Sequence, residues 1–190
     1  MNSIFTIMRP KQYIKNIFVL LPLFFAGKIT DTPLLEDALV AFVAFSLSAS
    51  AVYIFNDYND IKEDRKHPKK KFRPLASGLI SKNSALSLMV ILLIVSFTLI
   101  KSVSINALAI LSIYVILNIA YSLKLKRIAL LDVTIIAIGF VLRLFAGSFA
   151  YEVPLKIWIV IMTFLLALFL ALAKRRDDVL IFKKSGNKMR

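Results

Sequence analysis

Three aspartates near the middle of the chain are spaced so that a helix would bring them onto one face. Asp57, Asp60 and Asp64 are separated by three and four residues. Asn56, four residues before Asp60, adds an amide beside the same face. Because stacked carboxylates repel one another unless a cation neutralises them, the row predicts a cation site. Mg²⁺ suits it, since this ion takes a few carboxylate oxygens and completes its shell with water and substrate phosphates.

A basic, proline-bounded segment follows the aspartates directly. Residues 65–74 read RKHPKKKFRP, in which Pro68 and Pro74 end or bend helices and the Lys and Arg side chains are candidate phosphate partners. Carboxylates for a metal beside cations for phosphate suit the binding of a diphosphate. The alternative is a solvated loop with local salt bridges, the usual meaning of mixed charge. We expect His67 to be a loop or phosphate contact rather than a general base.

The segments that must position these residues are long and apolar. Of the 190 residues, 59% are hydrophobic and the mean hydropathy is +0.78, which is typical of membrane proteins. A transmembrane helix needs about 20 mostly apolar residues, and long unalternating runs disfavour strands. We therefore predict one membrane domain, an all-α multi-pass transmembrane helix bundle with six spans at about 14–30, 36–56, 84–102, 105–122, 130–150 and 156–174.

The distribution of Lys and Arg tests these spans independently. Of the 25 basic residues, 21 belong to one side: the N-terminal segment, the motif loop at 57–83, the loop after the fourth span, and the end of the chain with its basic tail at 175–190. The other side holds Lys28, Lys101 and Lys156. The positive-inside rule then predicts a multi-pass protein of the cell membrane with both termini cytoplasmic.

The acidic row continues backwards into the second predicted span. Tyr53, Ser50 and Ser46 extend it at the same helical spacing. Unpaired polar groups that face lipid cost several kcal/mol. We therefore expect this polar stripe to face a cavity inside the bundle.

Composition also argues against several kinds of site and partner. The chain has no cysteine, so disulfides and thiolate metal sites are excluded. The net charge of +14 does not predict a nucleic-acid partner, because the apolar runs leave no separate basic domain; basic excess here fits loops that face anionic lipid. The first residues lack a small-residue cleavage site, so no removable signal peptide is expected.

Further polar residues are expected at the cytoplasmic ends of later spans. Tyr114, Asn118 and Tyr121 form a row at helical spacing, and the basic loop YSLKLKR follows. An interfacial aromatic belt with basic anchors explains these residues equally well. The last span ends in KRRDD, which taken alone is more often an ordinary helix terminus than a site.

Arg143 lies inside the fifth predicted span, eleven residues after Asp132. The two share a helix face but lie about 16 Å apart, so they cannot pair directly. An intramembrane arginine is a functional hypothesis by default. Snorkelling to the outer interface or bracing a neighbouring helix is equally plausible.

The stretch NDYNDIKEDRKHPKKKFRPLASG, residues 56–78, resembles the first aspartate-rich motif of the UbiA superfamily of intramembrane prenyltransferases. That motif is Asn-Asp-x-x-Asp-x-x-x-Asp followed by Arg-Pro-Leu-Ala-Ser-Gly. The His-Pro-x-Lys insertion, RPKQYIKN, YSLKLK, RLFAG and KRRDD look like the branch that contains decaprenyl-phosphate phosphoribosyltransferase. The first motif is highly specific, and the others are individually weak but occur in the right order along the whole chain.

The resemblance implies a cytoplasm-facing central cavity in which Mg²⁺ binds a diphosphate donor between two acidic motifs. It implies that Asp57, Asp60 and Asp64 are catalytic. Carried over by position, the metal ligands would be Asn56, Asp57, Asp60, Asp64, Asp177 and Asp178. The substrate-binding residues would be Lys15, Lys70, Arg73, Tyr121, Lys126, Arg175 and Arg176.

The main functional hypothesis is a Mg²⁺-dependent transferase that moves phosphoribose from a soluble phosphoribosyl diphosphate to a polyprenyl phosphate in the bilayer. A prenyltransferase acting on an aromatic or other acceptor is the alternative, and a non-catalytic truncated subunit is the alternative from another class. KRRDD in place of Asp-x-x-x-Asp favours the phosphoribosyl branch. Family members usually have about nine spans, so the chain is expected to lack the last three. Homo-oligomerisation is left open.

Overall fold

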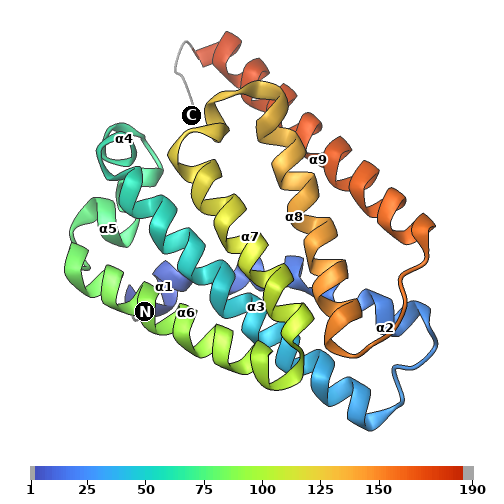
Figure 1. Ribbon diagram of the computed structural model, residues 1–190. Helices are drawn as coiled ribbons and strands as arrows, with labels where there is room; N and C mark the ends of the chain where they lie inside the picture. Colours follow the sequence, from blue (N-terminus) through green and yellow to red (C-terminus); the bar gives the residue numbers. More distant parts are fainter. Residues whose placement is uncertain (1–2, 186–190) are drawn as a thin grey trace.

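The computed structural model describes residues 3–185, without the side chains of residues 129, 178, 179 and 181–185. Within that range every regular element is helical (Figure 1). In chain order the elements are α1 (Ser3–Met8), η1 (Pro10–Val19), α2 (Leu21–Phe25), α3 (Thr32–Asn59), α4 (Ile61–Lys66), η2 (Lys70–Phe72), α5 (Pro74–Ser77), α6 (Lys82–Val103), α7 (Ile105–Leu123), η3 (Leu125–Arg127), α8 (Ala129–Ala150) and α9 (Ile157–Ser185).

Five helices of the described chain, not six, are long and apolar enough to cross a membrane: Thr32–Asn59, Lys82–Val103, Ile105–Leu123, Leu130–Ala150 and Ile157–Asp177. They correspond to the second to sixth predicted spans. The prediction of one continuous helix at 14–30 is not confirmed. That segment is divided between η1, a 3-10 helix, and the five-residue α2.

Proline and glycine explain why the first predicted span is irregular. Pro10 begins η1, Pro22 lies in the first turn of α2, and Gly27 adopts a positive φ of 69° after α2 ends. A proline inside one continuous helix would remove a backbone hydrogen bond and clash with the preceding turn, and a positive φ cannot continue a right-handed helix, so one helix over 14–30 is unfavourable. The segment is instead fixed by tertiary contacts: the Tyr151 hydroxyl donates to the Val19 carbonyl at 2.8 Å and accepts from the Leu23 N–H at 3.2 Å.

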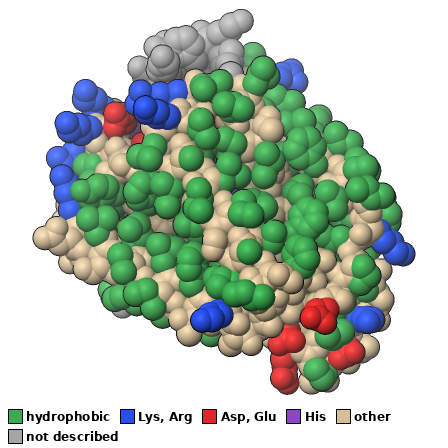
Figure 2. Space-filling model, viewed as in Figure 1, with side chains coloured by type: hydrophobic (Ala, Val, Ile, Leu, Met, Phe, Trp, Pro, Cys, Tyr) green, Lys and Arg blue, Asp and Glu red, His purple; other side chains and the backbone are tan. Residues whose placement is uncertain are grey.

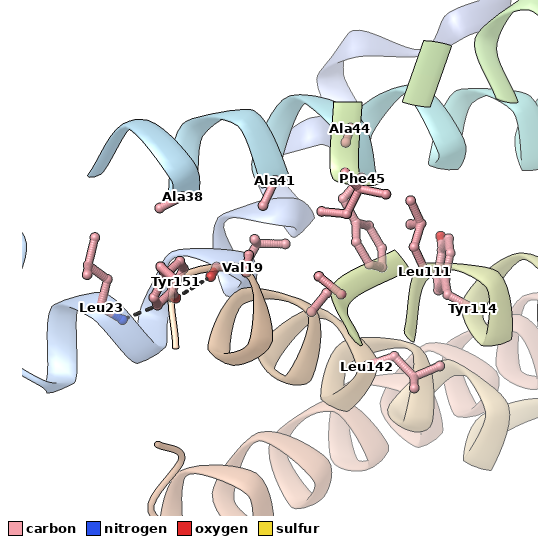
Figure 3. Packing of buried hydrophobic residues seen from close by; sticks show 14 of the residues in the cluster. Val19, Leu23, Ala38, Ala41, Ala44, Phe45, Leu111, Tyr114, Leu142 and Tyr151 are labelled. Atoms are coloured by element: carbon pink, nitrogen blue, oxygen red, sulfur yellow. Dashed lines mark hydrogen bonds between the residues drawn. The ribbon is translucent and has the colours of Figure 1, made fainter. Parts of the chain in front are cut away.

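Helix α3 is the central element of the bundle and packs against α6, α7 and α8 (Figure 1). Small side chains allow this close packing, as is common between membrane helices. Ala38, Ala41 and Ala44 on α3 are fully buried in the main core, which Figure 3 shows together with Phe45 and Tyr114. The core therefore holds α3 and the acidic row at its end in a defined orientation.

The outer surface of the bundle is apolar, as expected for an integral membrane protein. Large hydrophobic side chains are exposed along α6, α7 and α9, for example Ile94, Ile116 and Phe169. In Figure 2 hydrophobic side chains cover the middle of the face shown, and charged side chains gather towards its two ends. In water this surface would be unfavourable, whereas lipid can cover it.

Two segments, the one predicted as a loop at 57–83 and the one predicted as a tail at 175–190, differ from their predicted form. The loop predicted at 57–83 is mostly helical, because α3 continues to Asn59 and α4, η2 and α5 follow. The tail predicted at 175–190 is continuous with α9 as far as Ser185, and 186–190 lie outside the described residues. Basic residues of KRRDD are therefore presented from a helix.

Candidate functional site

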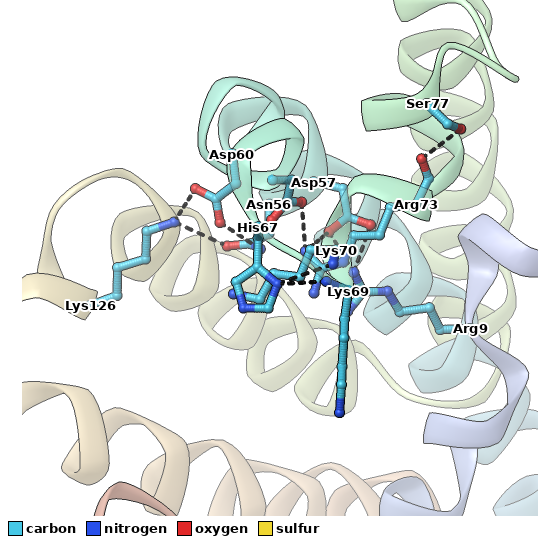
Figure 4. A network of polar contacts seen from close by, with 11 residues as sticks. Arg9, Asn56, Asp57, Asp60, His67, Lys69, Lys70, Arg73, Ser77 and Lys126 are labelled. Carbon is cyan, nitrogen blue, oxygen red and sulfur yellow. Dashed lines mark hydrogen bonds and ion pairs between the residues drawn. The ribbon is translucent and has the colours of Figure 1, made fainter. Parts of the chain in front are cut away.

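The acidic row lies where α3 ends and α4 begins, on one side of a polar network (Figure 4). Asp57 and Asp64 are 2% and 3% exposed and share one partner. The Nη1 atom of Arg73 donates to Asp57 at 3.0 Å and to Asp64 at 2.7 Å. Both carboxylates thus converge on one nitrogen of Arg73, the residue directly before Pro74 and α5.

Asp57 has a second guanidinium partner that comes from the other end of the sequence. Nη2 of Arg9 donates to both carboxylate oxygens of Asp57, at 2.5 and 2.6 Å. The Arg9 guanidinium also lies over the Tyr53 ring, 5.1 Å from its centroid. Tyr53 and Asp57 are four residues apart on α3, so Arg9 contacts two successive turns on one face of that helix.

Asn56 and Asp60 form a second pair, turned towards η3. The Asn56 amide donates to Asp60 at 3.1 Å, and the Lys126 ammonium contacts Asp60 and, at 3.5 Å, the Asn56 oxygen. Figure 4 shows Lys126 reaching this pair from the opposite side to Arg9. The row that the sequence predicts as one group is thus divided into two pairs with different cations.

The basic segment after the row is ordered by its own backbone. Nδ1 of His67 accepts from the N–H groups of Lys69 and Lys70, at 3.1 and 3.2 Å. The expectation that His67 is a loop contact fits this geometry. Partial burial, followed by the charge of Arg73, lowers the pKa of the Lys70 ammonium below its ordinary value. A phosphate bound beside it would act in the opposite direction, because an anion favours the charged form.

The donor atoms present fit Mg²⁺ chemically. Carboxylate and amide oxygens are the hard ligands that Mg²⁺ prefers, and one or two carboxylates suffice when substrate phosphates complete the shell. Among the described residues, no three acidic or histidine side chains form a group that could hold an ion together. The convergent pair Asp57 and Asp64 therefore fits a metal better than a single site that uses the whole row.

Tyr121 and Arg175, both predicted as substrate-binding residues, contact a residue that the prediction did not assign to the site. Asp132, which is 1% exposed, accepts from the Tyr121 hydroxyl at 2.6 Å. It also accepts from Nε and Nη2 of Arg175, at 2.5 and 3.0 Å. Asp132 thus fixes the side chains of α7 and α9 at the start of α8.

For the other predicted site residues, no contact with the acidic row is described. Lys15 is exposed on η1, and Arg176 and Asp177 are exposed on α9. The side chain of Asp178 lies outside the part of the structure that is described. The structure therefore brings together Asn56, Asp57, Asp60, Asp64, Arg73 and Lys126, and it links Arg175 to Tyr121 through Asp132.

Arg9 and Asp132 are the residues of this region that sequence reasoning missed. Arg9 belongs to RPKQYIKN, a stretch whose resemblance to the family was noted without a role for its arginine. Asp132 was compared only with Arg143 on its own helix. Both partners of Asp132 are distant in sequence, by 11 and 43 residues, so no local spacing indicates them.

Arg143 braces the N-terminal segment against the bundle and does not reach the outer interface. Only 5% of it is exposed; Nε donates to Asn16 at 2.8 Å and Nη2 to the Tyr114 hydroxyl at 3.1 Å. Asn16 in turn donates to Ser46 on α3 at 2.9 Å. Of the interpretations left open by the sequence, these contacts support bracing.

Comparison with known proteins identifies the class of this helical bundle. The sequence model of the UbiA prenyltransferase family matches residues 16–185. The chain therefore belongs to the UbiA prenyltransferase family, and with its five apolar helices it is an integral membrane protein.

Two curated relatives are decaprenyl-phosphate phosphoribosyltransferases. The protein of Mycolicibacterium smegmatis is 35% identical to this chain over 96% of the chain and 59% of the relative. The protein of Corynebacterium glutamicum is 33% identical over 96% of the chain and 56% of the relative. The chain thus spans less than two thirds of the length of either.

A solved structure confirms the fold. It is that of a UbiA homologue from Archaeoglobus fulgidus bound to GPP and Mg²⁺. It superposes with a TM-score of 0.81 at 22% identity, over 98% of this chain and 67% of the other. At that identity the likeness establishes the arrangement of the helices.

Proposed function

We propose that this protein is a membrane transferase that displaces diphosphate, and that it moves phosphoribose from phosphoribosyl diphosphate to a polyprenyl phosphate. The observation that carries the proposal is the convergence of Asp57 and Asp64 beside Arg73, with Asn56, Asp60 and Lys126 adjacent. The names of the two curated relatives support the choice of donor and acceptor.

The chain's own residues would act mainly by holding charge in place. The bond between the ribose carbon and the diphosphate oxygen breaks, the diphosphate leaves with the electron pair, and a phosphate oxygen of the lipid forms the new bond. Arg73, Lys70 and Lys126 would bind the oxygens of the leaving group. Preorganised cations of this kind stabilise the negative charge that develops there.

Asp57 and Asp64 would hold Mg²⁺, and Asn56 and Asp60 would be a separate pair of candidate ligands beside them. The bound metal would supply further positive charge to the diphosphate. Arg175 and Arg176, with Asp177 and Asp178, are proposed as the second motif, and Lys15 as a further phosphate contact. The lipid phosphate is already an anion, so its attack requires no strong general base. The abundance of metal ligands and cations in the site is consistent with that chemistry.

The cavity would open to the cytoplasm, where a soluble diphosphate donor is available, and both termini would lie on that side. The support is the distribution of Lys and Arg: the acidic row and the basic segment 65–74 belong to the same side as most basic residues. The membrane would be the cell membrane.

The decisive experiment reconstitutes the full chain in lipid with phosphoribosyl diphosphate, polyprenyl phosphate and Mg²⁺, and measures labelled lipid product. Asp60→Ala and Asp64→Ala should each abolish product, as should chelation of the metal. Asp37→Ala, the same change at the opposite end of α3, should leave activity unchanged. Product that survives the two site variants would contradict the assigned site.

A prenyl transfer is the second candidate, favoured by the family and by the GPP bound in the Archaeoglobus fulgidus homologue. Turnover of a prenyl diphosphate with an aromatic acceptor, and none of phosphoribosyl diphosphate, would establish it instead. Inactivity with every donor, in protein that binds neither metal nor diphosphate, would favour a non-catalytic subunit.

A further inference from the structure

Arg9 has an unusual backbone conformation at the edge of the site. It lies in the left-handed region, with φ 55° and ψ 56°, directly before Pro10. Proline restricts the preceding residue towards extended backbone, and a non-glycine residue at positive φ is strained. Such strain persists only where the surroundings impose it, and it often marks a functional position.

Contacts with a single helix, α3, hold Arg9 in place. Before it, the Met8 carbonyl accepts from the Ser50 hydroxyl at 2.8 Å. Its own side chain lies over the Tyr53 ring. It also donates to both oxygens of Asp57 (Figure 4). These three partners lie on successive turns of one face, so the strained residue aims its guanidinium at the acidic row.

The pairing at Asp57 provides more positive charge than this carboxylate alone requires. Arg73 already donates to Asp57 and also to Asp64, whereas Arg9 adds a second guanidinium to Asp57. The side chain of Arg9 is 25% exposed, while Asp57 is 2% exposed. Because Arg73 also donates to Asp57, this carboxylate keeps a cationic partner when the Arg9 side chain turns towards solvent.

We propose that Arg9 is a further diphosphate-binding residue, which occupies the metal position at Asp57 when no ligand is bound. When a divalent cation and a diphosphate enter, Arg9 leaves Asp57 to the cation and pairs with the diphosphate. The exchange keeps every charge partnered: Asp57 retains a cation and Arg9 gains an anion. Guanidinium matches both groups, because it binds carboxylate and phosphate oxygens in the same bidentate manner. The inference rests on the proposed diphosphate chemistry.

The test compares Arg9→Gly with the wild-type protein in two binding measurements. Glycine accepts the left-handed backbone without strain, so the variant should fold. The first measurement uses Mn²⁺ in place of Mg²⁺ and follows its binding by electron paramagnetic resonance. The variant should bind Mn²⁺ more tightly than the wild type, because the competing Arg9 guanidinium is gone. The second measurement adds inorganic diphosphate to Mn²⁺. The affinity of the variant for diphosphate should fall about tenfold or more, because the charge-assisted hydrogen bonds from Arg9 are lost.

Opposite signs in the two measurements are what a purely structural role cannot produce. Arg9→Lys should give an intermediate result, and Lys11→Gln, which removes an exposed charge two residues away, should change neither affinity. In an Asp57→Asn background, Arg9→Gly should no longer tighten Mn²⁺ binding. Weaker binding of both ligands, or no change in either, would overturn the inference.

The probe separates this inference from the proposed substrate. Inorganic diphosphate carries neither ribose nor prenyl groups, so its binding is independent of the donor's identity. If Arg9→Gly shows the two opposite effects but wild-type protein does not turn over phosphoribosyl diphosphate, the substrate assignment fails and the role of Arg9 stands. Wild-type protein that binds no Mn²⁺ would overturn the role of Arg9.

Discussion

Asp57, Asp64 and Asp132 are buried and paired with cations, whereas Asp60 is 26% exposed and pairs with Lys126. Asp57 contacts Arg9 and Arg73, and Asp132 contacts Arg175. A buried carboxylate is strongly unfavourable unless paired, so removing cationic partners from these residues weakens the fold as well as the site. At the scale of single residues, chemistry and stability therefore depend on the same contacts, and activity measurements need a stability control.

Asp132→Asn tests the residue that links α7, α8 and α9. Asparagine keeps the shape but removes the charge that holds Tyr121 and Arg175. Loss of hydrogen bonds to a charged group should lower the free energy of unfolding by about 2 kcal/mol. That corresponds to a fall of about 4–8 °C in Tm, measured by thermal unfolding in detergent.

Asp31→Asn is the matched control for that variant. The Asp31 side chain caps α3 at an exposed position by accepting from the Leu34 N–H, and asparagine caps a helix equally well. Its Tm should stay within about 1–2 °C of the wild-type value, since surface changes have small effects. An equal Tm for both variants would show that Asp132 has no special structural role.

At the scale of elements, the site depends on how η1 lies against α3 and α8. Arg143 from α8 and Ser46 from α3 both bind Asn16, which joins the irregular N-terminal segment to the bundle. The same segment carries Arg9 to the acidic row. The position of η1 thus determines whether Arg9 can reach Asp57.

Gly147→Ala tests the contact between η1 and α8. A Cβ at Gly147 would lie 2.0 Å from the Val19 carbonyl oxygen and 2.8 Å from the Tyr151 hydroxyl. Because the first neighbour is backbone, η1 must shift, and we expect a loss of about 1–3 kcal/mol in stability from overpacking. Thermal unfolding measures the loss, and weaker diphosphate binding should accompany it.

Gly139→Ala, on the same helix, is the comparison. Its Cβ would meet Arg143 Nη1 at 3.5 Å, an ordinary contact. Alanine is a better helix former than glycine by about 0.5–1 kcal/mol, so this variant should be as stable as the wild type or more so. A larger loss at Gly139 than at Gly147 would refute the argument from close approach.

At the scale of the whole molecule, the orientation of the bundle in the membrane can be tested by labelling. The chain contains no cysteine, so single cysteines can be introduced without a background. Lys71→Cys, in the motif segment, should react with an impermeant maleimide only in inverted vesicles. Lys28→Cys, before α3, should react only in right-side-out vesicles, and the reverse pattern would contradict the proposed topology.

The class of fold can be predicted from the long apolar runs alone, because such runs in a membrane have few alternatives to the helix. The sequence also located the acidic row, since spacings of three and four place residues on one helix face whatever their surroundings. Five of the six predicted spans correspond to helices. The segment 14–30 does not form one helix, because its proline and glycine residues interrupt it and the contacts of Val19, Asn16 and Leu23 determine its path.

The division of the acidic row into two pairs, and the cations that contact each pair, depend on the tertiary structure. Arg9 and Lys126 lie 48 and 66 residues from Asp57 and Asp60, and Arg175 lies 43 residues from Asp132. Pairings at such distances are set by the packing of η1, α3, α8 and α9, and periodicity carries no information about them. Local spacing predicts the face on which a side chain lies, whereas the partner across the bundle depends on how the helices pack.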